Sequence, residues 1–126
     1  MKILITGING LIGGLLKQVL TGAADIYGVG LGYSVEEKIF VCDISDLSEL
    51  KRVFEELPVI DCVIHLAADP RTEAPWESIL KNNITGTHNV YECVRIFHVP
   101  KVIFASSNHV TGMYEGKPPN LHHHNN

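Results

Sequence analysis

Three glycines near the amino terminus, Gly7, Gly10 and Gly13, recur at three-residue intervals, a spacing that suits the binding of a phosphate group. Gly7 would permit a tight turn, Gly10 would let the backbone approach a ligand closely, and Gly13 would let a helix pack closely. Backbone N–H groups at the start of that helix would attract a pyrophosphate. The pattern is Gly-x-x-Gly-x-x-Gly after a threonine rather than the commoner Gly-x-Gly-x-x-Gly, so a plain tight turn is the alternative.

The segments on either side of these glycines favour the phosphate-binding interpretation. Lys2–Thr6 is a short, apolar, β-branched run, which is typical of a buried strand. After the glycines, apolar residues fall on one predicted helical face, at positions 11, 12, 15, 16, 19 and 20. A strand, a glycine turn and a helix in this order indicate the corner of a dinucleotide-binding fold.

Later segments predict a sheet around this corner. Four more apolar stretches are typical of strands: Ala24–Val29, Lys38–Cys42, Val59–Ala68 and Val99–Ala105. Helical spacing predicts helices over Leu47–Leu57, which Pro58 ends, and over Trp76–Val94, with a break near Thr85–Gly86. This alternation predicts an α/β fold, a Rossmann-type doubly wound parallel sheet of about five strands. We expect residues 1–112 to form a dinucleotide-binding domain and residues 113–126 to form a loop or disordered tail.

Small and polar residues follow several of the predicted strands, and parallel strands bring such residues to one crevice at the carboxyl edge of the sheet. These residues are Gly7–Gly13, Asp43, Ala67–Ala68 and Ser106–His109. Ala67 and Ala68 would keep the crevice shallow, so that a ligand lies against backbone. Asp43 would accept a hydrogen bond from an adenine amino group, or would simply end a strand with a polar residue; the fold favours the first.

Three further residues leave alternatives open. His65 lies inside an apolar strand, which favours a hydrogen-bonded core histidine over a catalytic one. Asn83 would bind neighbouring backbone and hold the adjacent loop, or would be an ordinary exposed amide. Gly30 stands where a carboxylate usually holds the adenosine ribose, and no Arg nearby favours a 2′-phosphate, so the residues do not decide between NAD and NADP.

The bulk composition excludes several classes of function. The 126 residues suffice for one domain, with 45% hydrophobic and 19% charged residues, as in ordinary globular proteins. The net charge of −4 argues against a nucleic-acid partner, and no apolar run nears the ~18 residues that span a membrane. Without a signal peptide we expect a cytoplasmic location. The apolar surroundings of Cys42, Cys62 and Cys93 favour a role as small buried hydrophobic residues over that of a catalytic thiol. His122–His124 would bind a metal adventitiously, and we expect no physiological metal site there.

These motifs resemble those of the extended short-chain dehydrogenase/reductases, the NAD-dependent epimerase/dehydratase family. The matching segments occur in family order: Thr6–Gly13 (TGINGLIG), Asp43–Asp46 (DISD), His65–Ala68 (HLAA), Asn83–Thr87 (NITGT) and Ala105–Ser107 (ASS). Within the family, Pro75–Leu80 (PWESIL) and Ser106–Gly112 (SSNHVTG) are most similar to uronate dehydrogenases. The resemblance implies oxidation of a hexuronic acid at its anomeric carbon, with hydride passed to NAD.

The resemblance also implies roles for individual residues. Ser107 would align the reacting sugar hydroxyl, and Asn108 and His109 would contact the substrate. The cofactor, NAD with NADP not excluded, would be bound by Gly7, Asn9, Gly10, Leu11, Ile12, Gly13, Asp43, Ile44, Leu66, Ala67, Ala68, Asn83 and Ala105. No metal site is implied.

The chain departs from the family in its catalytic base, a tyrosine in a Tyr-x-x-x-Lys helix that follows the serine motif. Tyr114 and Lys117 are one residue too close together and lie in a Gly/Pro-rich segment. We therefore expect the NAD(P)-binding portion of a sugar or hexuronate oxidoreductase or epimerase, inactive by itself, without the last strands and the substrate lobe. The alternatives are a non-catalytic nucleotide-binding module, a homo-oligomer paired through the open edge at Val102–Phe104, and a truncated remnant.

Overall fold

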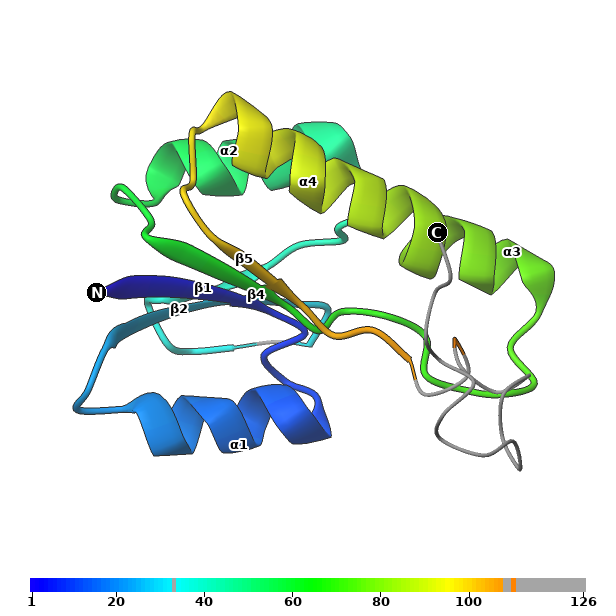
Figure 1. Ribbon diagram of the computed structural model, residues 1–126, viewed down its shortest axis with the longest axis horizontal. Coiled ribbons are helices and arrows are strands. Elements are labelled where there is room, and N and C mark those ends of the chain that lie inside the picture. The colour runs from blue at the N-terminus through cyan, green and yellow to red at the C-terminus, as the bar shows by residue number, and fades with distance from the viewer. Residues whose placement is uncertain (33, 108–109, 111–126) are drawn as a thin grey trace, which may run out of the picture.

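The computed structural model describes residues 1–32, 34–107 and 110 (Figure 1). Its strands are β1 (Lys2–Thr6), β2 (Asp25–Gly30), β3 (Ile39–Val41), β4 (Cys62–His65) and β5 (Val102–Phe104). Its helices are α1 (Leu11–Leu20), α2 (Leu47–Glu56), α3 (Trp76–Ser78), the π-helix η1 (Ile79–Thr85) and α4 (Gly86–Ile96). The predicted tail, residues 113–126, lies outside the described residues.

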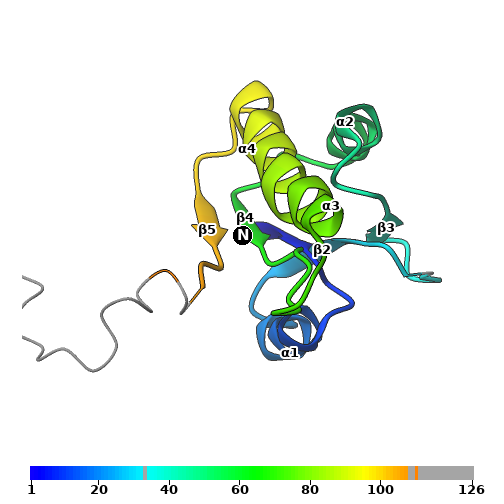
Figure 2. The same ribbon diagram turned by 90° about the vertical axis from the view of Figure 1, so that its right-hand side faces the viewer.

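The five strands form one parallel sheet in the order β3-β2-β1-β4-β5, which confirms the predicted doubly wound fold. Helix α1 covers one face of the sheet, whereas α2, α3 and α4 lie over the other (Figure 2). The order reverses between β1 and β4, where Thr6 pairs with both Val29 and His65. Ligands of doubly wound sheets bind at this switch point.

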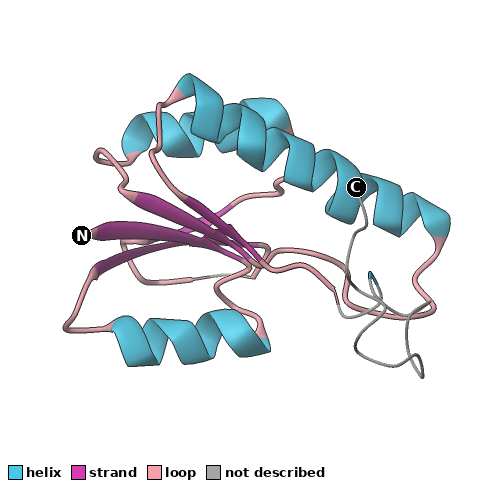
Figure 3. Ribbon diagram, in the orientation of Figure 1, coloured by secondary structure: helices cyan, strands magenta, loops and turns pink. Residues whose placement is uncertain are grey.

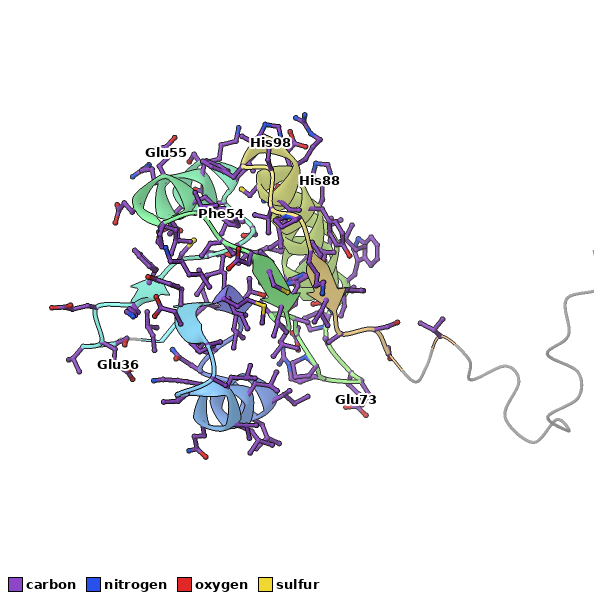
Figure 4. All side chains as sticks on the ribbon, turned by 60° about the vertical axis from the view of Figure 1, so that its left-hand side comes forward. Glu36, Phe54, Glu55, Glu73, His88 and His98 are labelled. Carbon is purple, nitrogen blue, oxygen red and sulfur yellow. The ribbon has the colours of Figure 1, made fainter. Side chains whose placement is uncertain are left out.

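Alternating side chains of the sheet fill two separate hydrophobic clusters. On the side of α2 and α4, Leu4, Val29 and Val63 pack against the buried faces of those helices. Phe54 points inward from α2 into this cluster, while its neighbour Glu55 points away (Figure 4). On the opposite side, Ile3, Ile5, Ile8, Cys62 and Ile64 form a smaller cluster under α1.

Three predicted elements differ from the structure. The predicted strand over Val59–Ala68 is shorter, because Val59 is 85% exposed and the chain leaves the sheet after His65. The predicted apolar face of α1 is only partly used: Leu16 and Leu20 pack against the sheet, but the rest of the apolar set is exposed, at Leu11, Ile12, Leu15 and Val19. The predicted second strand, Ala24–Val29, is shifted by one residue, so that β2 ends at Gly30 itself.

The long helix after the crevice continues through the predicted break near Thr85–Gly86, so that prediction was wrong. Elements α3, η1 and α4 follow one another as one helical rod (Figure 3), and the helix changes from π to α geometry between Thr85 and Gly86 without interruption. A Cβ on Gly86 would lie 2.7 Å from Ile44 Cδ1, so the Ile44 side chain would have to move to admit one. The rod therefore packs closely on the segment after β3, which brings two parts of the crevice together.

Candidate functional site

The glycine turn between β1 and α1 is tightly packed. Gly7 has a φ of +72°, a conformation that favours glycine, and a Cβ on it would lie 2.8 Å from the backbone N of Ala67. A Cβ on Gly13 would lie 2.2 Å from the carbonyl oxygen of Gly7. The Gly7 N–H donates to the Val29 carbonyl at 2.8 Å. The turn is thus held between β2, the segment after β4 and the first turn of α1.

The amino terminus of α1 offers unpaired donors to an anion. Its N-cap is Gly10, which has no side chain to accept from the first-turn N–H groups, and the first turn contains no acid. Gly10 and Leu11 are exposed. A pyrophosphate fits this site, because the first N–H groups of a helix lack partners within the helix and carry a partial positive charge. Asn9, Leu11 and Ile12, which the sequence predicts to bind the cofactor, border the same turn.

A buried hydrogen-bonded chain supports this corner from below. Thr6 Oγ1 accepts from the backbone N–H groups of Leu66 and Ala67, both at 3.2 Å. Its own hydroxyl then donates to His65 Nδ1 at 2.7 Å, and His65 Nε2–H donates to Thr87 Oγ1 at 3.0 Å. Burial lowers the pKa of His65 to about 4, so the ring is neutral at pH 7. His65 is a core residue that positions backbone, as predicted.

The loop after β4 is fixed by Asn83, in the way that the sequence predicts. Asn83 Oδ1 accepts from the Asp69 N–H at 2.7 Å, and Asn83 Nδ2 donates to the Asp69 carbonyl at 3.1 Å. Hydrogen bonds from Arg71 and Ser78 hold the pKa of the Asp69 carboxyl far below its usual range. Ala67 and Ala68 precede this braced loop, and Ala68 is exposed at the edge of the crevice.

Asp43 lies at the carboxyl end of β3 and already has protein partners. Its Oδ1 accepts from the Ser45 N–H at 2.9 Å, and its Oδ2 pairs with Lys81 Nζ at 2.8 Å. Burial alone would raise the pKa of this carboxyl, but the hydrogen bonds from Lys81 and Ser45 outweigh it and lower the pKa. An adenine amino group would share these oxygens. Ile44 is buried under Gly86, so it would contact a ligand only through its backbone.

Sequence reasoning missed several of the residues that shape the crevice. Lys81 pairs with Asp43, Asn89 donates to the carbonyls of Ile44 and Ser45, and Thr87 holds His65. Asn89 is 4% exposed, and a polar residue among the apolar positions of a helix was the signal that could have found it. Lys81 gives no such signal, because an exposed lysine on a helix is ordinary.

The serine motif follows β5 at the same edge of the sheet. The Ala105 N–H donates to the His65 carbonyl at 3.1 Å, which extends the pairing of β5 with β4. Ser107 is exposed, and its carbonyl accepts from the Val110 N–H at 3.2 Å. Asn108 and His109, the predicted substrate contacts, lie outside the described residues.

The three cysteines are buried, free thiols. Burial raises the pKa of Cys42 to about 12 and that of Cys93 to about 11, so both are protonated at neutral pH. Over residues 1–32, 34–107 and 110, His, Cys, Asp and Glu side chains form no group of three that could hold a metal ion. In the same ranges, no helix combines the length and the apolar character that a membrane span requires.

Known proteins share this arrangement over nearly the whole chain. The NAD dependent epimerase/dehydratase family model matches residues 3–125. An NAD-dependent glucose-6-phosphate dehydrogenase of Haloferax volcanii is 35% identical over 122 residues, which cover 90% of this chain and 45% of that protein. A uronate dehydrogenase of Pseudomonas syringae pv. tomato is 34% identical over 120 residues, covering 90% of this chain and 42% of that protein. The chain thus spans less than half the length of these relatives.

Solved structures of similar proteins also share the fold of this chain. A mutant of uronate dehydrogenase from Agrobacterium tumefaciens, complexed with NAD, superposes with a TM-score of 0.76 at 29% identity, covering 86% of this chain and 41% of that one. UDP-glucose 4-epimerase from Bifidobacterium longum, in complex with NAD+ and UDP, has a TM-score of 0.77 at 26% identity, covering 89% and 38%. Together with the glycine corner and the parallel sheet, these matches show that the chain belongs to the NAD dependent epimerase/dehydratase family.

Proposed function

We propose that this chain forms the NAD(P)-binding portion of an oxidoreductase that acts on a sugar or a hexuronic acid. The observation that carries the proposal is the uncapped amino terminus of α1, placed at the switch point of the sheet beside the packed glycine turn. The family and the sugar and uronate dehydrogenases among the relatives support the substrate class. Three free, buried thiols accord with a cytoplasmic location, which we include in the proposal.

In this proposal different residues of the crevice bind different parts of the coenzyme. The N–H groups that follow Gly10 bind the pyrophosphate, Asp43 and the Ile44 backbone contact the adenine, and Ala67–Ala68 form a flat backbone surface on the adenosine side. Bound NAD would accept a hydride from the sugar. Ser107, beyond β5, would align the sugar hydroxyl that loses its proton.

Calorimetric titration of the 126-residue chain with NAD+ tests the coenzyme part of the proposal. We expect saturable one-site binding, and a folded chain that binds neither NAD+ nor NADP+ would contradict the proposal. Adding a hexuronate to the NAD+ complex is expected to give no NADH, because no Tyr-x-x-x-Lys motif occurs in these residues. NADH formation that is lost in Ser107→Ala would show instead that this chain performs the reaction itself.

We also propose that copies of this chain associate along β5. Within the described residues β5 is an edge strand, and Ile103 and Phe104 are about half exposed. Ile103 pairs with Ile64, so its side chain lies on the α1 face of the sheet. The other side of α1 borders the groove at Lys17 and Thr21, so helical geometry turns the exposed residues Ile12, Leu15 and Val19 toward the β5 flank. Exposed apolar side chains on an edge strand and on the helix beside it are typical of an interaction site.

Sedimentation equilibrium tests this second proposal. We expect concentration-dependent dimers for the wild type and a shift to monomer in Ile103→Lys. Val41→Lys is the matched control, because Val41 is equally exposed, 52% for each residue, on the opposite edge strand β3. A monomer at high concentration, or equal effects of the two lysines, would contradict association through β5.

A further inference from the structure

The end of β2 lacks the side chain that usually contacts the adenosine ribose in this fold. A carboxylate at this position normally hydrogen-bonds the ribose hydroxyls. In this chain β2 ends at Gly30, and Leu31 and Gly32 follow it. No carboxylate therefore extends from this strand end toward a bound dinucleotide.

The carboxamide of Asn9 occupies the space that such a side chain would fill. A Cβ on Gly30 would lie 3.0 Å from Asn9 Nδ2, and a Cβ on Gly32 would lie 2.9 Å from the same atom. Asn9 Nδ2 also donates a hydrogen bond to the Gly32 carbonyl at 3.3 Å. One exposed amide thus connects the glycine turn to the loop after β2, and it is positioned by both.

Asn9 presents a neutral acceptor at this position. Its Nδ2 is directed to Gly32, while its Oδ1 accepts no hydrogen bond from the part of the chain that the structure describes. The carboxylate in the adjoining groove, Glu36, is paired with Lys17 at 2.5 Å. This groove, of about 490 Å³, lies between α1 and the segment 34–39 and is bordered by Asn9. A 2′-hydroxyl would find an acceptor here, and a 2′-phosphate would meet no unpaired carboxylate.

We infer that Asn9 is the residue that contacts the adenosine ribose, and that the chain consequently binds NAD+ and NADP+ with similar affinity. The inference rests on the proposed coenzyme binding. The carboxamide accepts a hydrogen bond from the 2′-hydroxyl through Oδ1. Because it carries no charge, it does not repel the 2′-phosphate of NADP+, whereas a carboxylate in the same place would.

Titration of both coenzymes into the wild type and into two Asn9 variants tests the inference. The two wild-type dissociation constants are expected to lie within about tenfold of each other. Asn9→Ala should weaken NAD+ binding about three- to tenfold, the effect of one hydrogen bond. Asn9→Asp, which changes charge but not size, should weaken NADP+ by more than about tenfold relative to NAD+. Glu55→Ala, which removes an exposed side chain from α2, outside this groove, should change neither constant.

A double variant moves the carboxylate to the strand end. Asn9→Ala combined with Gly30→Asp removes the contact at 3.0 Å and should favour NAD+ by more than about tenfold. A wild type that separates the coenzymes more than about a hundredfold, or an Asn9→Ala variant that binds both as the wild type does, would overturn the inference alone. A wild type that is folded by circular dichroism and binds neither coenzyme would overturn the proposed function as well.

Discussion

The amino termini of α1 and α2 both follow a strand of the same sheet, but they differ in capping. The first N–H groups of α2 are bound by a side chain, whereas those of α1 are not. Helix α2 is capped by Asp46, whose Oδ1 accepts from the N–H groups of Ser48 and Glu49 at 2.9 and 3.0 Å. Helix α1 begins at Gly10, which offers no acceptor. The capped end satisfies its own donors, whereas the open end keeps them for a ligand.

The two ends also differ in what supports them. Helix α2 depends on its own first turn, where Glu49 reaches back to accept from the Asp43 N–H at 3.0 Å. The start of α1 depends on distant segments: the Gly7 turn touches Ala67, and the chain from Thr6 through His65 to Thr87 holds that backbone. A local cap needs few residues close in sequence, while an open anion site needs tertiary packing to keep it in shape.

The largest effect is expected from Gly13→Ala, which disturbs the packing of the open end. Its Cβ would lie 2.2 Å from the Gly7 carbonyl oxygen and 2.8 Å from Ile8 Cα, both backbone atoms. We expect the free energy of unfolding in urea to fall by at least about 3 kcal/mol. Gly14→Ala is the control, because its Cβ would meet nothing nearer than 3.9 Å, and it should stabilise the chain by about 0.5–1 kcal/mol. Equal effects would show that the turn is not tightly packed.

The next effect concerns pH, because protonation of His65 should weaken the buried chain that supports the amino terminus of α1. The folded pKa of His65, about 4, lies below its unfolded value near 6.5. The unfolded chain therefore binds the proton first, and stability present above pH 6.5 is lost as the pH falls toward 4, by on the order of 3 kcal/mol. His65→Gln should remove this part of the pH dependence in urea unfolding measured from pH 7 to pH 4.

His88 provides the control for this pH experiment, because it is exposed on α4, away from the buried chain (Figure 4). His88→Gln should keep the wild-type pH profile of the free energy of unfolding. Identical profiles for the wild type and His65→Gln would mean that burial does not hold the His65 ring neutral.

A smaller effect is expected at the capped end. Asp46→Ala removes the acceptor of two N–H groups and should lower the thermal midpoint by about 4 °C. NAD+ affinity should not change, because α2 does not contribute its amino terminus to the proposed site. Glu55→Ala, an exposed acid on the same helix, should leave the midpoint within about 1 °C. A loss of NAD+ affinity in Asp46→Ala would show that the two ends are not independent.

The features that depend on local sequence were predictable. The strand, glycine turn and helix of the corner follow from neighbouring residues, and so does the end of α2 before Pro58. The brace that Asn83 makes was predictable too, because a helix beside a loop places an amide within reach of its backbone. Because the sheet is parallel, Gly7, Asp43 and Ala67, which follow β1, β3 and β4, lie at the same edge of the sheet.

The remaining features depend on contacts distant in sequence. The pairing of Lys81 with Asp43 and of Asn9 with Gly32 joins segments that only the folded sheet brings together. The exposure of one apolar side of α1, with Leu15 and Val19, was not predictable, because periodicity shows that a face is apolar but not what covers it. How much of an apolar helix is buried depends on how many elements cover that face of the sheet, and α1 alone covers its face (Figure 2).

The most direct test of the account is to give α1 the cap that α2 has. Gly10→Asp places a carboxylate at this amino terminus, where the backbone is extended; its Cβ would lie 3.2 Å from the Gly7 carbonyl oxygen, which must shift slightly to admit it. Calorimetric titration with NAD+ should then show at least a tenfold loss of affinity, about 1.4 kcal/mol, with the thermal midpoint nearly unchanged. Gly10→Asn, of equal size but uncharged, should lose less. A Gly10→Asp variant that binds NAD+ as tightly as the wild type would contradict the claim that this helix end holds the pyrophosphate.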